Sequence, residues 1–482
     1  MTNSLNTFFQ LVQQKLMDKV TQDETLRIAH KIEQMIPYCV IYPETESDIQ
    51  VILHYAQEFH AAVTPWGSGL FMDLGYSLQR YDVCVDLSQM TSIISYNTEN
   101  QCISVAAGVP LRNIQRYLSR IGRALPFEIT HSLNATAGGL VAAGMYEIEQ
   151  GLYGGLRAAL QEIQLIDASG ILYSTATYKS ILMGGLSINE MCIGSLGTLG
   201  IITTITLRTI PEPLHELYIL IGFPTLTAIQ YFIRHISKIA GGQFSMIFCC
   251  REGIFSAAAE VFGEDYSAEM DEAEVFCVIK MPERQDISNE EAHFGKDPQF
   301  TSSQNSARIF FEAQHTGASF ILNIGAEAGN EIWSELAAFT KLPKSANTIA
   351  LLHITVTSTD IVRLVDGAQD VCREYGLNCY WLADGAAGNV WLLIFDPTAD
   401  NTHESEKSEE LRGYLLSLHT YLSTRWHNVR VLWIRDRWKN AIALWKNASP
   451  WLDMLRTLKR QRDPQNILNP GKLFREEKDP AK

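Results

Sequence analysis

Apolar residues along the chain follow two different periods, and the two alternate. Thr45 and Asp48 have the spacing of a helix-capping pair, and the apolar positions behind them repeat at helical spacing. Residues 83–87 place an apolar residue at every second position, and residues 201–207 are rich in β-branched side chains, so both segments are predicted strands. Short helices and strands therefore alternate through residues 38–210.

Beyond a hinge at Pro211-Glu-Pro213, the pattern predicts a second region. Residues 217–222 and 349–356 each indicate a strand that is followed by a helical pattern. We expect an α+β domain with an internal duplication there, followed by a last helix and an extended tail. The predicted domains are a helical segment at 1–37, a main domain at 38–213, an inserted domain at 214–440 and a C-terminal helix and tail at 441–482.

Composition narrows the class of protein. Of 482 residues, 46% are hydrophobic and 19% are charged, which excludes disorder over most of the length. The net charge of −15 argues against nucleic-acid binding. Nine scattered cysteines without a C-x-x-C spacing indicate free thiols in a reducing compartment, and neither a signal peptide nor a transmembrane run is apparent. A cytoplasmic location is therefore expected.

The charge is uneven along the sequence. Residues 425–475 are rich in Lys and Arg, whereas the rest of the chain is acidic. A basic segment of this kind is consistent with an anionic cofactor, a partner or a membrane surface, and equally with a solvated helix. Peripheral membrane contact through this segment is one expectation.

Three glycine-rich segments indicate a ligand site. The first, Gly67-Ser68-Gly69-Leu70, follows a short apolar strand and can present backbone N–H groups to a diphosphate. The second runs from Asn134 to Gly144 and the third from Gly194 to Ile201, and small residues there let a flat ligand approach the backbone. Neither matches the nicotinamide fingerprint or the Walker A loop, which disfavours both of those functions.

These segments, in this order, resemble the FAD-binding domain of the vanillyl-alcohol-oxidase superfamily, also called PCMH-type. The tail from Asp463 to Phe474, which contains Asn469-Pro-Gly-Lys472, is similar to the closing motif of its glycolate oxidase and D-lactate dehydrogenase branch. The segment from Leu125 to Glu128 is most similar to the second flavin subunit of glycolate oxidase. The resemblance implies an α+β fold: a two-part FAD-binding domain with an inserted, ferredoxin-like cap and a tail that returns to the flavin.

The resemblance also implies site residues and a non-covalent FAD. The cofactor-binding residues it implies, with Ile201 near the adenine, are Gly67, Ser68, Gly69, Leu70, His131, Asn134, Thr136, Gly138, Gly139, Gly144, Gly197, Ile201, Asn469 and Lys472. For catalysis the candidates are His131 and Glu128, although a structural role is the competing interpretation for each.

The inserted domain departs from the family pattern. The branch carries metal-binding histidines around a Gly-Asp-Gly-Asn stretch, but here Asp384 and Trp391 stand in the histidine positions and Ala387 replaces the aspartate. No metal site is therefore expected. His353 and Asp384 are interpreted as a core histidine and a turn residue.

Besides a metal-free sugar or alditol oxidase, two functions stay open at this point. The first is an FAD-dependent oxidoreductase that oxidises an alcohol or a glycolate- or lactate-like 2-hydroxy acid by hydride transfer to flavin N5, without the family's metal. The alternative is a flavin-holding, non-catalytic or electron-relay subunit of a glycolate-oxidase-like complex. Its partners would be a second flavin subunit or an iron–sulfur subunit.

Overall fold

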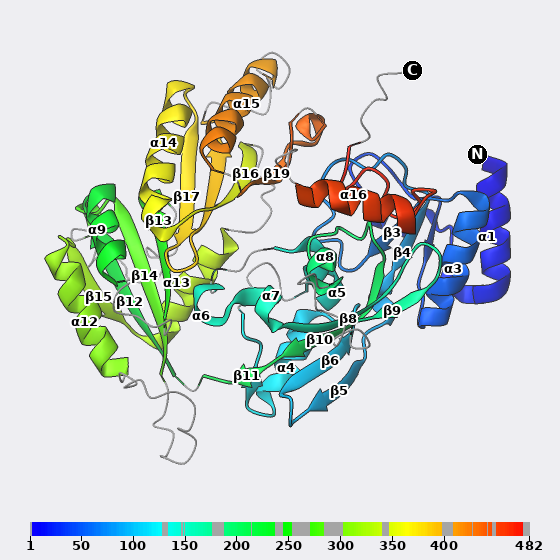
Figure 1. Cartoon of the computed structure of the whole chain (residues 1–482), viewed down its shortest axis with the longest axis horizontal. Helices are drawn as coiled ribbons and strands as arrows, with labels where there is room; N and C mark the ends of the chain where they lie inside the picture. Colours follow the sequence, from blue (N-terminus) through cyan, green and yellow to red (C-terminus); the bar gives the residue numbers. More distant parts are fainter. Residues whose placement is uncertain are drawn as a thin grey trace. The chain divides into compact units, whose positions relative to one another are not determined.

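The structure, a computed structural model, divides into two compact units (Figure 1). The first unit consists of Met1–Met145, Leu156–Ile210 and Arg435–Lys482, and the second of Tyr146–Gly155 and Pro211–Ile434. The structure describes residues 2–127, 134–145, 148, 150–175, 188–213, 215–236, 244–252, 270–283, 302–339, 347–397, 408–426, 428–440, 442–445 and 450–475.

Two sheets form the first unit. A four-stranded sheet has the order β1-β2-β4-β3, in which β4 is parallel to both of its neighbours. A five-stranded antiparallel sheet has the order β5-β6-β10-β8-β9. Their strands are β1 (Val20–Thr21), β2 (Cys39–Ile41), β3 (Val63–Trp66), β4 (Val83–Asp86), β5 (Ile93–Asn97), β6 (Cys102–Ala106), β8 (Leu160–Ile166), β9 (Leu172–Ser174) and β10 (Ile201–Arg208).

Helices cover these sheets and share one hydrophobic core with them. In α3 (Glu46–Phe59), Thr45 and Asp48 form the predicted capping box, and the apolar face behind it is fully buried. The other elements of this unit are α1 (Thr2–Leu16), α2 (Glu24–Ala29), α4 (Leu111–Ser119), β7 (Arg123–Ala124), α5 (Ala137–Ala143), α7 (Gly155–Ala159), α8 (Ile188–Cys192) and α16 (Pro450–Arg462), with β11 (Ile210–Pro211) at the boundary of the units.

The C-terminal segment returns to the first sheet. Val63 of β3 bridges Leu468 in parallel, its N–H donates to the carbonyl of Ile467, and its carbonyl accepts from the N–H of Asn469. A buried ion pair between Lys459 and Asp463 fixes the approach, because Lys459 also donates to the carbonyl of Leu468. The tail thus lies beside β3, at the loop that follows this strand.

The second unit is built on one eight-stranded sheet of two similar halves. The order is β15-β12-β14-β13-β17-β18-β16-β19, so each half repeats β-α-β-β-α-β with the same internal order, and β13 and β17 join them. This arrangement confirms the predicted ferredoxin-like duplication. The strands are β12 (His215–Phe223), β13 (Ser245–Cys250), β14 (Val275–Glu283), β15 (Phe320–Ile324), β16 (Thr348–Thr355), β17 (Asn378–Asp384), β18 (Asn389–Phe395) and β19 (Asn428–Ile434).

Helices lie on both faces of this sheet (Figure 1). Phe223 of β12 packs on Phe232 of α9, whereas Tyr218, which has the opposite parity, packs under Gly329 of α13. The helices are α9 (Leu226–Ile236), α12 (Ser302–His315), α13 (Ala326–Ala338), α14 (Ile361–Glu374) and α15 (Ser408–Arg425), together with the short α6 (Gln150–Tyr153).

The division differs in detail from the predicted boundaries. The breaks fall after Ile210 and after Ile434 rather than at 213 and 440, and Tyr146–Gly155 groups with the second unit. The physical reason for the last difference lies in α6. Asn389 donates a 2.7 Å hydrogen bond to Gln150, and a Cβ on Gly151 would lie 2.4 Å from that of Ala386, so only glycine permits this approach.

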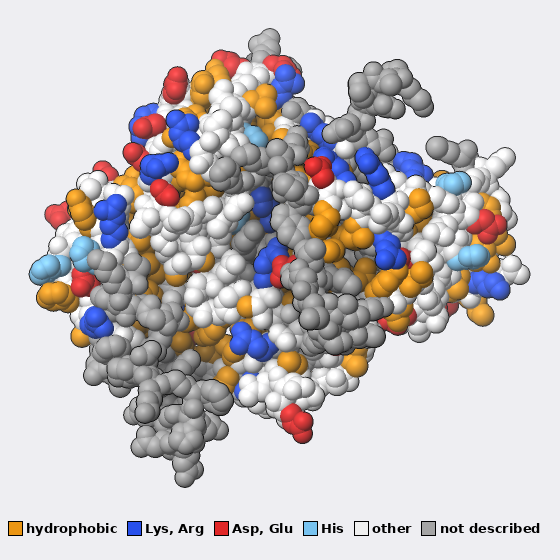
Figure 2. All heavy atoms as spheres, in the orientation of Figure 1, with side chains coloured by type: hydrophobic (Ala, Val, Ile, Leu, Met, Phe, Trp, Pro, Cys, Tyr) orange, Lys and Arg blue, Asp and Glu red, His pale blue; other side chains and the backbone are white. Residues whose placement is uncertain are grey.

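Some basic side chains of the segment near the C-terminus form contacts within the protein. Basic side chains surround α16 on the face seen in Figure 2, and Arg460 and Arg462 are exposed. Arg456 pairs with Asp453, and Arg462 donates to the hydroxyl of Tyr173. No helix among the described residues is both long and apolar enough to cross a bilayer. Membrane contact stays a prediction.

Candidate functional site

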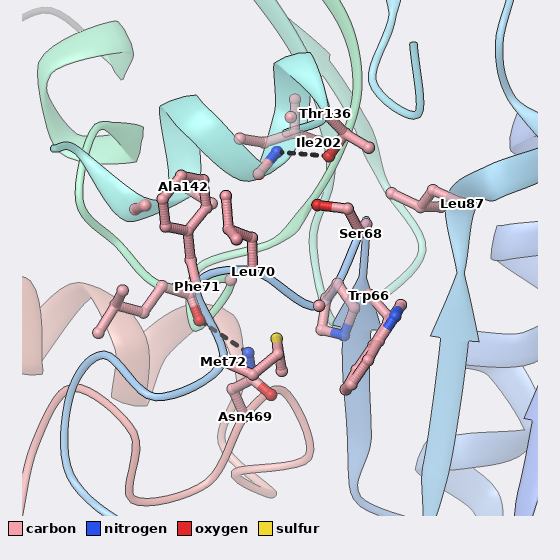
Figure 3. A pocket seen from close by; sticks show the side chains of 18 of the residues that line it. Trp66, Ser68, Leu70, Phe71, Met72, Leu87, Thr136, Ala142, Ile202 and Asn469 are labelled. Atoms are coloured by element: carbon pink, nitrogen blue, oxygen red, sulfur yellow. Dashed lines mark hydrogen bonds between the residues drawn. The ribbon is translucent and has the colours of Figure 1, made fainter. Parts of the chain in front are cut away.

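A pocket opens in the first unit where four distant segments meet (Figure 3). They are the loop after β3, helix α5, the stretch from Leu196 to Ile202 and the C-terminal tail. Ten of the residues implied by the family resemblance line it: Gly67, Ser68, Gly69, Leu70, Thr136, Gly138, Gly139, Gly197, Asn469 and Lys472.

The loop from Gly67 to Leu70 leaves its backbone donors open. None of the four N–H groups donates a hydrogen bond to a described residue. A Cβ on Gly67 would lie 2.2 Å from the hydroxyl oxygen of Thr136, and Gly69 has a φ of +76°. Glycine at both positions therefore permits a turn in which successive N–H groups are available to an anion.

Helix α5 forms the opposite wall through its smallest residues. Thr136 caps the helix by accepting a 3.2 Å hydrogen bond from the N–H of Gly139, marked in Figure 3. A Cβ on Gly138 would lie 2.8 Å from that of Ala107, so glycine lets the helix approach the strand layer. Ala142 and Ala143, one turn further on, continue the same small-residue face along the pocket.

Asn469 connects two walls and keeps one polar atom without a partner. Its amide nitrogen donates a 2.7 Å hydrogen bond to the carbonyl of Leu196, and the side chain lies against Gly197, whose φ is +68°. Its Oδ1 is buried and has no hydrogen-bond partner among the described residues. A buried acceptor without a donor is costly, so this atom indicates a ligand that supplies one.

Lys472 brings a positive charge into the same pocket. The residue is buried, its Nζ donates a 2.6 Å hydrogen bond to the carbonyl of Met72, and it forms no ion pair with a described residue. Burial lowers the pKa of this ammonium to about 8, and the charge of nearby Lys439 acts in the same direction. A buried cation without a carboxylate favours an anionic ligand.

Not every implied residue lies at the pocket. The side chain of Asn134 accepts a hydrogen bond from Arg112, and Gly144 ends α5 with a φ of +58° against Gly194. Ile201 is fully buried in the core, and its neighbour Ile202 lines the pocket instead. His131 and Glu128 lie outside the described residues, so their catalytic roles stay predictions.

Sequence reasoning missed several pocket residues. Trp66, Met72 and Leu196 were not among the predicted site residues, because nothing local distinguishes them from packing side chains. A signal did exist for two others. Ala142 follows Gly138 and Gly139 at helical spacing, and Ile202 alternates with Ile201 along a strand, so the two periods could have identified them.

The segment of the second unit that departs from the family pattern is a tight turn. The Oδ1 of Asp384 accepts 2.9 Å hydrogen bonds from the N–H groups of Ala386 and Ala387, which closes the hairpin between β17 and β18. A Cβ on Gly388 would lie 1.9 Å from the carbonyl oxygen of Val356. Asp384 therefore does act as the turn residue that the sequence suggested.

His353 lies next to this turn, in β16, and is fully buried. Its ring packs edge-on against Trp391 at 5.2 Å between centroids and contacts the side chain of Asn389. Burial and the charge of Arg430 lower the pKa of His353 to about 3, so the imidazole is neutral at physiological pH. No group of three or more metal-ligating side chains occurs among the described residues.

Comparisons with known proteins match the segments that line most of the pocket. A family model described as an FAD binding domain matches residues 37–176, and one described as the C-terminal domain of FAD linked oxidases matches residues 439–473. The mitochondrial D-lactate dehydrogenase (cytochrome) of Arabidopsis thaliana is 23% identical over 95% of this chain and 78% of its own. The D-lactate dehydrogenase of Archaeoglobus fulgidus is 21% identical over 91% of each.

Solved structures agree on the fold. p-Cresol methylhydroxylase with substrate bound superposes with a TM-score of 0.73 at 16% identity, over 98% of this chain and 97% of its own. Alkyldihydroxyacetonephosphate synthase superposes with a TM-score of 0.72 at 15% identity, over 97% of this chain and 86% of its own.

The pocket fits FAD on its own chemistry. A diphosphate matches the open N–H groups of the Gly67–Leu70 loop and the charge of Lys472. The N–H and hydroxyl groups of FAD can supply the donor that Asn469 Oδ1 lacks. The two matched regions also include most of the pocket wall. The chain is an FAD-binding oxidoreductase that is similar in sequence to D-lactate dehydrogenases and similar in fold to p-cresol methylhydroxylase.

Proposed function

We propose that this oxidoreductase converts a 2-hydroxy acid such as D-lactate or glycolate to the 2-oxo acid, without a resident metal ion. The observation that carries the proposal is the pocket, in which open backbone donors, Asn469 and Lys472 meet in one unit. Two relatives that match more than nine tenths of this chain are D-lactate dehydrogenases, which supports this substrate class.

FAD, when bound, supplies the acceptor for the hydride that leaves the carbinol carbon, while the hydroxyl proton goes to a base. The chain's own residues orient the cofactor: Asn469 and Lys472 lie on one wall and the small face of α5 on the other. We assign the base to His131 or Glu128 on the family resemblance. Reoxidation of the cofactor needs an external acceptor, such as a quinone, oxygen or an iron–sulfur protein.

The metal-free part of the proposal rests on the second unit. Asp384, in place of one family histidine, uses Oδ1 to close its own turn, and Trp391, in place of another, is a buried indole. Neither arrangement resembles an open metal-ligand position. Chelator treatment followed by activity measurement tests this directly: unchanged turnover is expected, and a loss that zinc restores would contradict it.

The central experiment is an anaerobic absorption spectrum of the purified holoprotein before and after D-lactate, L-lactate or glycolate. Bleaching of the flavin band by D-lactate or glycolate, with L-lactate inactive, is the expected result. A protein that binds no FAD would contradict the cofactor assignment itself. Flavin bands that every hydroxy acid leaves unchanged would contradict the substrate class and favour a flavin-holding subunit.

That second candidate has one observation in its favour: the similarity of Leu125–Glu128 to a glycolate oxidase subunit. Partners for such a subunit, a second flavin protein or an iron–sulfur protein, are proposals only. Isolation of the chain with its native partners distinguishes the two. Turnover by the isolated chain contradicts the subunit function.

A further inference from the structure

The N-terminal strap, residues 23–37, contacts Trp66, the residue that precedes the Gly67–Leu70 loop, and does not line the pocket. It consists of α2 and the turn after it. A 2.7 Å hydrogen bond from Arg27 to the carbonyl of Pro37 closes the strap on itself, and a 3.0 Å ion pair between Glu33 and buried Lys439 attaches it to the C-terminal segment. Its one buried polar side chain is His30.

His30 touches the residue that precedes the cofactor loop. Its ring centroid lies 4.9 Å from that of Trp66, with the planes at 57°. Trp66 ends β3 and lines the pocket, and a Cβ on Gly69 would lie 2.5 Å from Cζ2 of the indole. The indole therefore occupies the space that a side chain at position 69 would need, directly against the backbone of the loop.

Two acceptors fix the His30 ring. Its Nδ1 lies 2.7 Å from the carbonyl oxygen of Leu26, and its Nε2 lies 2.9 Å from Oδ2 of Asp86. A carbonyl and a carboxylate both accept hydrogen bonds, so the protonated ring, in which both nitrogens donate, matches these two partners. Burial opposes this charge, but the hydrogen bonds to Asp86 and Leu26 outweigh burial and raise the pKa of His30.

Asp86 is the last residue of β4, which pairs with β3. It lies opposite Trp66 in the parallel pairing of β3 and β4, and its Oδ1 accepts a 2.8 Å hydrogen bond from the N–H of Ser88. The hydroxyl of Tyr81 donates a 2.8 Å hydrogen bond to the carbonyl of His30. The His30 ring is thus held at a fixed place against the indole.

We infer that His30 is a positioning residue for FAD: it holds Trp66 under Gly69, so that docking of the N-terminal strap and binding of the cofactor are coupled. The inference rests on the FAD site of the proposed function and adds a remote determinant of its affinity. Coupling of two binding events is reciprocal, so FAD binding must also stabilise the docked strap.

A double-mutant cycle on the full chain tests the inference. The quantity measured is the Kd of FAD for the apoprotein, in His30→Ala, Trp66→Leu and the double variant. The matched control is His54→Ala, because His54 is also a histidine beside an aromatic ring (Tyr55) but is exposed on α3. Folding of each variant is checked by circular dichroism.

We expect His30→Ala to weaken FAD binding about tenfold, in line with the loss of an aromatic contact and its hydrogen bonds, and the control to change it less than twofold. In the Trp66→Leu background the same change should have no further effect, because His30 acts through the indole. A purely structural role would instead give additive effects. Additivity, or an unchanged Kd in His30→Ala, overturns the inference.

A second measurement needs no variant and covers the case in which His30→Ala fails to fold. Hydrogen exchange of the wild-type strap is compared with and without FAD. Slower exchange of the amides of Leu26–His30 on FAD binding is expected, and no difference overturns the coupling. Failure of the wild-type apoprotein to bind FAD at all would instead contradict the cofactor assignment.

Discussion

Two glycine-containing turns, one in each unit, have opposite chemistry. The Gly67–Leu70 loop leaves four backbone N–H groups without a described acceptor and faces a cavity. The Asp384–Gly388 turn uses its own groups: Ala386 and Ala387 donate to the Asp384 side chain, and Gly388 donates to its carbonyl. Glycine content alone does not identify a binding loop. A binding loop is identified by backbone N–H groups that have no acceptor and that face a cavity.

The largest expected effect comes from filling the open loop. In Gly67→Asp, the new carboxylate would accept the loop's N–H groups and repel a diphosphate, and its Cβ would displace the Thr136 hydroxyl. We expect FAD affinity to fall by about 100-fold or more. Flavin content of the purified protein and FAD titration of the apoprotein measure it. Retention of stoichiometric flavin would show that the loop does not bind the cofactor.

Replacing a glycine in the Asp384–Gly388 turn should lower the stability of the protein without changing its affinity for FAD. Gly388→Ala places a methyl group against the carbonyl of Val356 at a φ of +73°. The free energy of unfolding should fall by about 2–4 kcal/mol, with FAD affinity of the folded protein unchanged. Urea unfolding and FAD titration measure the two quantities. Gly413→Ala, at an exposed helical site with open space, is the matched control. Weakened FAD binding by Gly388→Ala would remove the contrast.

Replacing Lys472 should raise the stability of the apoprotein and lower its affinity for FAD. Lys472→Met removes a buried charge, so the apoprotein should become more stable, by about 1–3 kcal/mol near neutral pH. FAD affinity should fall by about tenfold, because a charge-assisted contact is lost. Thermal unfolding of the apoprotein and FAD titration give both numbers. Two changes of the same sign would place Lys472 outside the cofactor site.

The pH dependence of apoprotein stability sharpens this prediction. The folded-state pKa of Lys472, about 8, lies below its ordinary value of 10.5, so the unfolded chain binds more protons between these pH values. Wild-type stability should therefore rise as the pH increases from about 8 to 10.5. The Lys472→Met variant should lack this contribution.

The smallest effect belongs to the buried histidine of the second unit. His353 has a folded-state pKa of about 3 against an ordinary 6.5, so the unfolded chain binds more protons as the pH falls between them. Stability should decline on the acid side, by about 1 kcal/mol near pH 5.5 for this group. His353→Phe should reduce this slope in urea unfolding. An unchanged slope would mean that His353 is not the neutral core group described here.

Residue spacing and hydrophobic periodicity predicted the features that depend on interactions between residues close in sequence. The capping box at Thr45 and the duplicated sheet of the second unit follow from residue spacing and from a repeated strand-then-helix pattern. The pocket glycines came from a family resemblance, and the structure brings most of them together. The cofactor contact of Ile201 stays a prediction: Ile201 is buried in the core and Ile202 lines the pocket, because strand parity relative to the pocket is set by tertiary packing.

Contacts between distant segments could not be predicted from sequence. Residues 1–37 were expected to be a helical segment, yet α2 ends at Ala29 and His30 turns onto Trp66. The partner of His30, Asp86, lies 56 positions further along the chain, and no local period connects them. The same reason applies to α6: one hydrogen bond and one close glycine contact, both with residues far along the chain, group it with the second unit.

The C-terminal tail has a consequence for biosynthesis. The tail residue Lys472 donates a hydrogen bond to the carbonyl of Met72, 400 positions earlier in the chain, and Asn469 donates one to the carbonyl of Leu196. Translation proceeds from the N-terminus, so the loop and α5 leave the ribosome long before this wall of the pocket exists. The whole second unit is synthesised in the interval. Stable capture of FAD is therefore a late event, completed only after residues 467–472 have emerged and paired beside β3.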